Sequence, residues 1–178
     1  MADALHPPPT GTLDVTIVEG PPQERSETVN ARTGVQPQHA SLRTWLLVLA
    51  GCTTAFGIMH HVDHVVRGNH SGWPFEQAVT PFTFSLLIYA LLLPGLYLTA
   101  KGRPMPRYWL FTAAVGLALV VWVHFIPTGD YEAPVDDIYA VYGSPLAGLF
   151  ALVVLAGLVI SLAVLAIAAV QSLRLTKR

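Results

Sequence analysis

Four long stretches of apolar residues dominate the pattern of hydrophobic and polar positions along this chain. They cover approximately residues 44–66, 81–100, 108–126 and 145–173. An α-helix rises 1.5 Å per residue and the hydrocarbon core of a bilayer is about 30 Å thick, so about 20 apolar residues suffice to cross it. The pattern therefore predicts an all-α fold, an integral membrane four-helix bundle, with residues 41–178 as its transmembrane domain.

The first forty residues differ in composition. Residues 7–9 and 21–22 are prolines, and Ser, Thr, Gln and Glu are scattered among them. A segment of this kind buries too little apolar surface to offset the entropy of ordering it. We expect residues 1–40 to form a disordered, Pro-rich N-terminal tail.

The overall composition agrees with a membrane protein whose main partner is the lipid bilayer. Charged residues make up 12% of the chain, about half the share usual in soluble domains. Ten basic against eleven acidic side chains leave a net charge of −1, which gives no electrostatic footprint for nucleic acid. The single cysteine, Cys52, excludes an intramolecular disulfide and a cysteine-based metal site. A homo-oligomer or a larger membrane complex stays open.

The distribution of basic residues predicts the orientation. Lys and Arg lie before the first stretch, between the second and third, and at the C-terminal end, whereas the other two connections are acidic. The basic residues in these three places include Arg32, Arg43, Lys101, Arg103, Arg107, Arg174, Lys177 and Arg178. The other two connections contain one basic residue, Arg67, against the acidic residues Glu76, Asp130, Glu132, Asp136 and Asp137. Because cytoplasmic loops retain Lys and Arg, we expect a multi-pass protein of the cell membrane with cytoplasmic N- and C-termini.

Ionisable residues crowd the end of the first apolar stretch. At 100° per residue, His60, Asp63, His64 and Arg67 fall within about a third of the helix circumference, and His61 lies at its edge. Ionisable groups inside a membrane span are costly and usually functional. With the predicted orientation, this candidate site lies at the extracytoplasmic end of the bundle.

The residue types in this cluster favour a metal site. His60 and His64 stand one turn apart, Asp63 adds a carboxylate, and His124 near the end of the third stretch lies at similar depth. Imidazoles with a carboxylate suit a divalent transition metal such as Zn, Cu or Fe. A haem held by His124 and either His60 or His64 is the less favoured cofactor, because only one such cross-helix pairing is available. Secondary ligand candidates are His61 and His70.

Two other functions compete with metal binding. A membrane-embedded acid–base enzyme could use Asp63 as its catalytic acid, with Glu76, Asp136 and Asp137 nearby, to cyclise or isomerise a lipid or isoprenoid. A non-enzymatic accessory subunit or pH-responsive protein would use histidines that change charge between about pH 5 and 8. The simplest interpretation is an Asp63–Arg67 ion pair beside solvated histidines. The sequence leaves open whether the protein is an enzyme.

Overall fold

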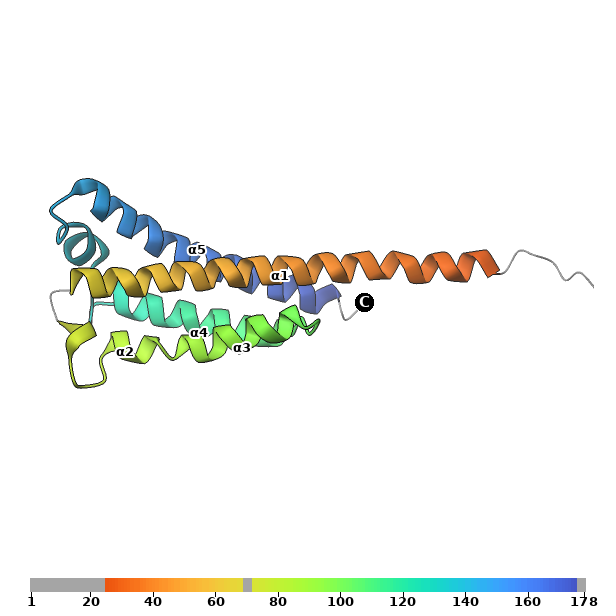
Figure 1. The fold of residues 1–178 in the computed structure, drawn as a ribbon, viewed down its shortest axis with the longest axis horizontal. Helices are drawn as coiled ribbons and strands as arrows, with labels where there is room; N and C mark the ends of the chain where they lie inside the picture. The colour runs from red at the N-terminus through yellow and green to blue at the C-terminus, as the bar shows by residue number, and fades with distance from the viewer. Residues whose placement is uncertain (1–24, 69–71, 176–178) are drawn as a thin grey trace, which may run out of the picture. The chain divides into compact units, whose positions relative to one another are not determined.

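The protein is described from a computed structural model, which covers the backbone of residues 25–68 and 72–175 and the side chains of residues 41–68 and 72–175. All regular elements in these ranges are helical (Figure 1). They are α1 (Arg25–Arg67), η1 (Trp73–Phe75), α2 (Pro81–Ser85), α3 (Ile88–Ala100), α4 (Pro106–Phe125), η2 (Pro134–Tyr139) and α5 (Pro145–Leu175).

Four helical segments in the described ranges are long and apolar enough to cross a membrane, so the predicted all-α membrane fold is confirmed. They are Ser41–Arg67, Pro81–Ala100, Pro106–Phe125 and Pro145–Leu175. The second consists of α2 and α3, separated by Leu86 and Leu87. At this break the amides of Tyr89 and Ala90 donate to carbonyls three residues earlier instead of four.

The chain divides into two compact units, residues 1–36 and 37–178. Helix α1 begins at Arg25, so the backbone of residues 25–40 is helical where the sequence predicts a disordered tail. Residues 1–24 of that predicted tail lie outside the described residues. Extending an existing helix adds one hydrogen bond per residue fixed, whereas nucleating one is costly. The disorder of residues 1–40 therefore stays a prediction.

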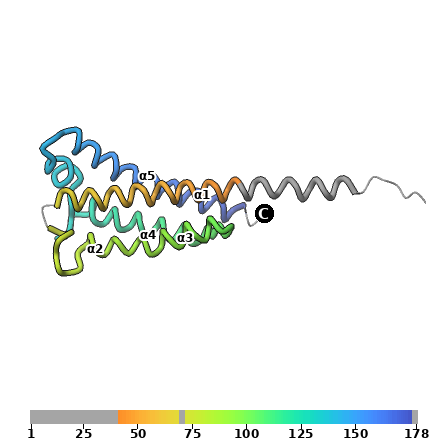
Figure 2. Tube along the Cα trace, in the orientation of Figure 1, coloured from red at the N-terminus to blue at the C-terminus, as the bar shows by residue number. Residues whose placement is uncertain are grey.

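The transmembrane segments meet in one apolar core. It includes Leu46 of α1, Leu92 of α3, Trp109 of α4, and Leu158 and Leu165 of α5. Helix α4 makes its most extensive contact with α5, and the two helices can be followed in Figure 2. The outward faces are also apolar, as in α1, where Val62 is 53% exposed. Such an outer surface is consistent with contact to lipid.

Two glycines allow the helices to approach closely. A Cβ atom at Gly116 would lie 2.8 Å from Leu162, and one at Gly157 would lie 2.5 Å from the ring of Phe56. Both separations are shorter than van der Waals contact. A side chain at either position would therefore force Leu162 or Phe56 to shift, and such small residues are common where membrane helices associate.

One end of the bundle collects the polar residues. Helix α1 ends there at Arg67, α4 ends there at Phe125, and η2 follows (Figure 1). Helix α2 begins at the same end with a capping box, in which Thr80 and Thr83 each accept a hydrogen bond from the other's backbone N–H. The Asp137 carboxylate accepts from the Ala133 amide at 2.6 Å and so caps η2. These connections hold the elements that build the candidate site.

Candidate metal centre

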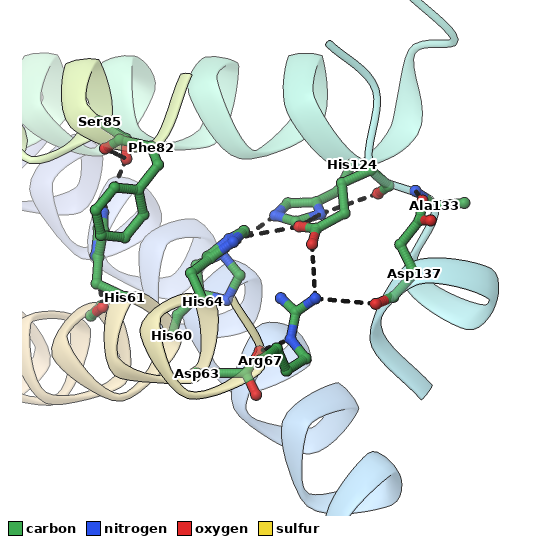
Figure 3. Close-up of polar contacts among 12 residues, drawn as sticks. His60, His61, Asp63, His64, Arg67, Phe82, Ser85, His124, Ala133 and Asp137 are labelled. Atoms are coloured by element: carbon green, nitrogen blue, oxygen red, sulfur yellow. Dashed lines mark hydrogen bonds and ion pairs between the residues drawn. The ribbon is translucent and has the colours of Figure 1, made fainter. Parts of the chain in front are cut away.

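The inner face of α1 carries the predicted cluster into the bundle. His60 is 6% exposed, His64 4% and Asp63 9%, whereas Val62 and Val65 on the other side are about half exposed. The His60 and His64 rings lie edge to face, with centroids 4.7 Å apart (Figure 3). The helical periodicity thus placed these three side chains on the buried face.

His124 of α4 completes a group of three buried imidazoles. Its Nε2 atom lies 3.1 Å from Nε2 of His60. One ring nitrogen from each of His60, His64 and His124 lies within 4.8 Å of the others, close enough to hold one metal ion. We call these three residues the histidine triad. Nothing in the sequence spacing relates α4 to α1, so the packing of the bundle makes this contact.

The hydrogen bond made by Nδ1 of His124 determines the protonation of its other ring nitrogen, Nε2, which faces His60. Nδ1 lies 3.2 Å from the backbone carbonyl of Glu132. Because a carbonyl can only accept, Nδ1 carries the hydrogen of the neutral ring, and Nε2 presents its lone pair to His60. A histidine that donates one N–H to a carbonyl and offers the other nitrogen is the usual arrangement of a metal ligand.

Glu132 contributes a carboxylate that sequence reasoning did not select. Its amide donates to the Val123 carbonyl at 2.9 Å, which folds the connection back over the end of α4 and buries the side chain completely. Its Oε2 atom lies 3.4 Å from Nε2 of His64 and 3.5 Å from Nδ1 of His124. The only signal in the sequence was an acid in a loop, which normally means a solvated residue.

Arg67 joins the carboxylates into a network. Its Nε donates to Oδ2 of Asp63 at 2.8 Å, and its Nη1 donates to Oε1 of Glu132 at 2.7 Å and to the Asp137 carbonyl at 2.9 Å. The Tyr142 hydroxyl donates to the other oxygen of Asp63. Asp63 is thus engaged with Arg67 and Tyr142, on the far side of the network from the triad (Figure 3).

The surroundings of the network change two pKa values. Burial raises the pKa of the Glu132 carboxyl, and the hydrogen bond and charge of Arg67 oppose this rise. Burial, and then the hydrogen bond and charge of Asp63, raise the pKa of Tyr142 to about 12. The Tyr142 hydroxyl therefore keeps its proton and serves as a donor to Asp63 over the physiological pH range.

The buried charged groups of the site do not balance one another. Two buried carboxylates, Asp63 and Glu132, face one guanidinium, Arg67, so one negative charge is left uncompensated when both acids are ionised. Nδ1 of His64 and Oε2 of Glu132 are buried without a hydrogen-bond partner. Unpartnered buried polar atoms are costly and call for a missing ligand. A cation held beside these residues would balance that charge.

The remaining predicted residues lie elsewhere. His61 faces a different set of groups, with Nε2 2.8 Å from the Ser85 hydroxyl and Nδ1 2.8 Å from both the Gly57 carbonyl and the Tyr89 hydroxyl. The secondary candidate His70 lies outside the described residues. The side chains of Glu76 and Asp136, which the acid–base alternative invoked, are exposed.

A cavity of about 70 Å³ opens directly beside the triad. Its walls come from α1, η1, α2, α3, α4 and α5 and are mostly apolar. All three residues of the triad and both His61 and Ser85 line it, whereas Asp63 does not.

Comparison of the chain with protein-family models, with curated proteins and with solved structures gives no match.

Proposed function

We propose that this chain is a membrane protein that binds one divalent transition metal ion through His60, His64 and His124. The proximity of three buried imidazoles from two helices is the observation that carries the proposal. Zn, Cu and Fe are all accommodated by imidazole ligands with a carboxylate nearby. The chain's one thiol, Cys52, is exposed and so takes no part.

The spacing of the imidazoles supports a shared ion. Two nitrogen ligands of a tetrahedral zinc ion, each bound at about 2.0–2.1 Å, lie about 3.3 Å apart. The 3.1 Å between the Nε2 atoms of His60 and His124 is close to that value. A hydrogen bond would also bring these atoms together, but it would leave Nδ1 of His64 and Oε2 of Glu132 without partners.

The supporting residues have distinct roles in this proposal. The carboxylate of Glu132 balances the charge of the ion, and its backbone carbonyl accepts a hydrogen bond from His124. Asp63, predicted as a ligand or a catalytic acid, acts as a positioning residue, because it orients Arg67, which in turn holds Glu132. Carboxylates of this kind commonly orient the histidine ligands of a metal. Three imidazoles leave a coordination position for water or an external ligand, as in catalytic zinc sites.

We also propose that the protein lies in the cell membrane with both termini in the cytoplasm. Four spans return the chain to the side on which it began, and the positive charges cluster at the termini and in the α3–α4 connection. The metal site then faces the extracytoplasmic side.

The direct test is the metal content of the full chain. Protein purified in detergent and dialysed against Zn²⁺ should retain about one ion per chain by elemental analysis, and it should lack the Soret band of a haem. His60→Ala, His64→Ala and His124→Ala should each lose most of the metal. His61→Ala is the matched control, since it removes an adjacent imidazole outside the triad, and it should keep the parental content.

Two results would contradict the proposal. One is a parent protein that retains no metal after dialysis although circular dichroism shows it to be helical. The other is equal metal content in all four variants, which would place the ion elsewhere.

A further inference from the structure

The cavity beside the triad is polar at one end and apolar along the rest of its length. His60, His64 and His124 border the polar end, together with His61 and Ser85, which are labelled in Figure 3. The remainder is lined largely by aliphatic side chains. These include Ile88, Leu92, Leu119, Val120, Leu158 and Leu162.

One further polar residue, Thr53, lines this cavity. Thr53 is 1% exposed, and its hydroxyl is buried without a hydrogen-bond partner. On the same helix its neighbour Thr54 has a partner, since it donates to the Ala50 carbonyl at 2.8 Å. The hydroxyl of Thr53, a residue that lines the cavity, is therefore left without a partner, which is unusual for a buried polar group.

Two residues that line the cavity, Thr53 and His60, give its extent along α1. At a rise of 1.5 Å per residue, Thr53 lies about 10 Å from His60 along α1. An extended hydrocarbon chain of roughly eight carbons covers that distance. Gly57, between the two, keeps the path open, since it presents no side chain to the cavity that it lines.

We infer that the cavity binds an elongated apolar molecule whose oxygen-bearing head group coordinates the metal ion, with its hydrocarbon chain extending toward Thr53. Apolar cavities stay dry and take up apolar guests, so the aliphatic walls favour a chain over water. The triad leaves a coordination position at the cavity's polar end, where the head group meets it. This inference rests on the proposed metal site and names the class of ligand that the site takes.

Alkyl hydroxamic acids are suitable probes, because the hydroxamate chelates Zn²⁺ and the chain length can be varied. Isothermal titration of zinc-loaded protein should show octanohydroxamic acid binding at least about tenfold more tightly than acetohydroxamic acid. Each buried methylene contributes about 0.8 kcal/mol, or roughly fourfold in affinity, so a partly buried chain already exceeds this.

Long alkyl chains also partition into detergent. A pair of glycine variants distinguishes this partitioning from binding in the cavity. Gly57→Leu should block the chain and lower the affinity for octanohydroxamic acid about tenfold or more, with little effect on acetohydroxamic acid. Gly51→Leu lies on the same helix at a position where an added Cβ meets nothing within 4 Å, so both affinities should stay parental. If Gly57→Leu fails to fold, Gly57→Ala replaces it, because its Cβ would make ordinary contacts at 3.6 Å and 4.0 Å. Its methyl group should still weaken octanohydroxamic acid about threefold.

The outcomes distinguish the two proposals. If the protein binds Zn²⁺ and acetohydroxamic acid, but octanohydroxamic acid binds no more tightly and is insensitive to the Gly57 variants, the cavity inference is overturned while the metal site stands. If the protein binds no Zn²⁺, the proposed function fails first. A chain-length preference that Gly57→Leu removes and Gly51→Leu keeps supports the inference.

Discussion

Nε2 of His60 and Nε2 of His124 lie 3.1 Å apart, although 64 positions separate the two residues in the chain. The Nδ1–H of His124 donates to a carbonyl, so its Nε2 lone pair faces His60. Without a metal, His60 must donate a proton to that lone pair. With a metal, both lone pairs bind the ion. In the proposed function, a bound ion would therefore change how α1 and α4 are joined.

Metal removal should lower the stability of the protein. An ion that binds only the folded state adds about 2.7 kcal/mol when its concentration is a hundred times Kd. Thermal unfolding in detergent should thus occur at a lower Tm after chelation, and Zn²⁺ should restore it. His60→Ala should show no dependence on Zn²⁺, whereas His61→Ala should respond like the parent. A Tm of the parent that is indifferent to chelator and Zn²⁺ would argue against a structural contribution of the ion.

Glu132→Gln should weaken metal binding about 10–100-fold, since it removes the carboxylate charge beside two of the imidazoles and keeps the side-chain shape. Competition with a zinc-sensitive dye measures the change. Glu76→Gln is the control, because Glu76 carries the same charge but is exposed. Equal affinities in the two variants would remove Glu132 from the site.

Arg67→Met should destabilise the fold by about 3–5 kcal/mol, because it leaves Asp63 and Glu132 buried without their cation. Unfolding by denaturant in mixed micelles measures the free energy. Adding Asp63→Asn in the same chain should recover part of the loss, since one of the two unpaired charges is then gone. If the double variant is no more stable than Arg67→Met, the unpaired charge of Asp63 is not a cause of the loss.

Tyr142 should make stability depend on alkaline pH. Its pKa is raised from the ordinary 10 to about 12, so the protonated hydroxyl is favoured by folding. This contribution is complete below pH 10 and is lost as the pH rises through about 12. Between pH 9 and pH 12, the parent should therefore lose more stability than Tyr142→Phe in Tm measurements. Tyr139→Phe should behave as the parent does, and identical alkaline profiles for the parent and Tyr142→Phe would contradict the assignment.

The orientation can be tested with single cysteines in a Cys52→Ser background. Glu76 and Arg103 are both exposed, and they lie in connections at opposite ends of the spans. In intact cells, a membrane-impermeant maleimide should label Glu76→Cys, and it should label Arg103→Cys only after permeabilisation. The reverse pattern would place the site on the cytoplasmic side.

Much of the architecture could be predicted from periodicity and length. The four spans follow from uncharged stretches that match the bilayer, because only a helix satisfies its backbone hydrogen bonds within lipid. The burial of His60, Asp63 and His64 on one face follows from the 3.6-residue repeat, which is a local property of α1.

The partners of each side chain were decided by tertiary structure. Asp63 and His64 are neighbours in sequence, yet Asp63 binds Arg67 and Tyr142 while His64 lies beside His60 and Glu132. Glu132 is buried because one backbone hydrogen bond to Val123 folds its loop over α4, and no local pattern encodes that bond. A helical repeat determines which side of a helix a residue occupies. What it meets there depends on how separate helices pack, which involves residues distant in the chain.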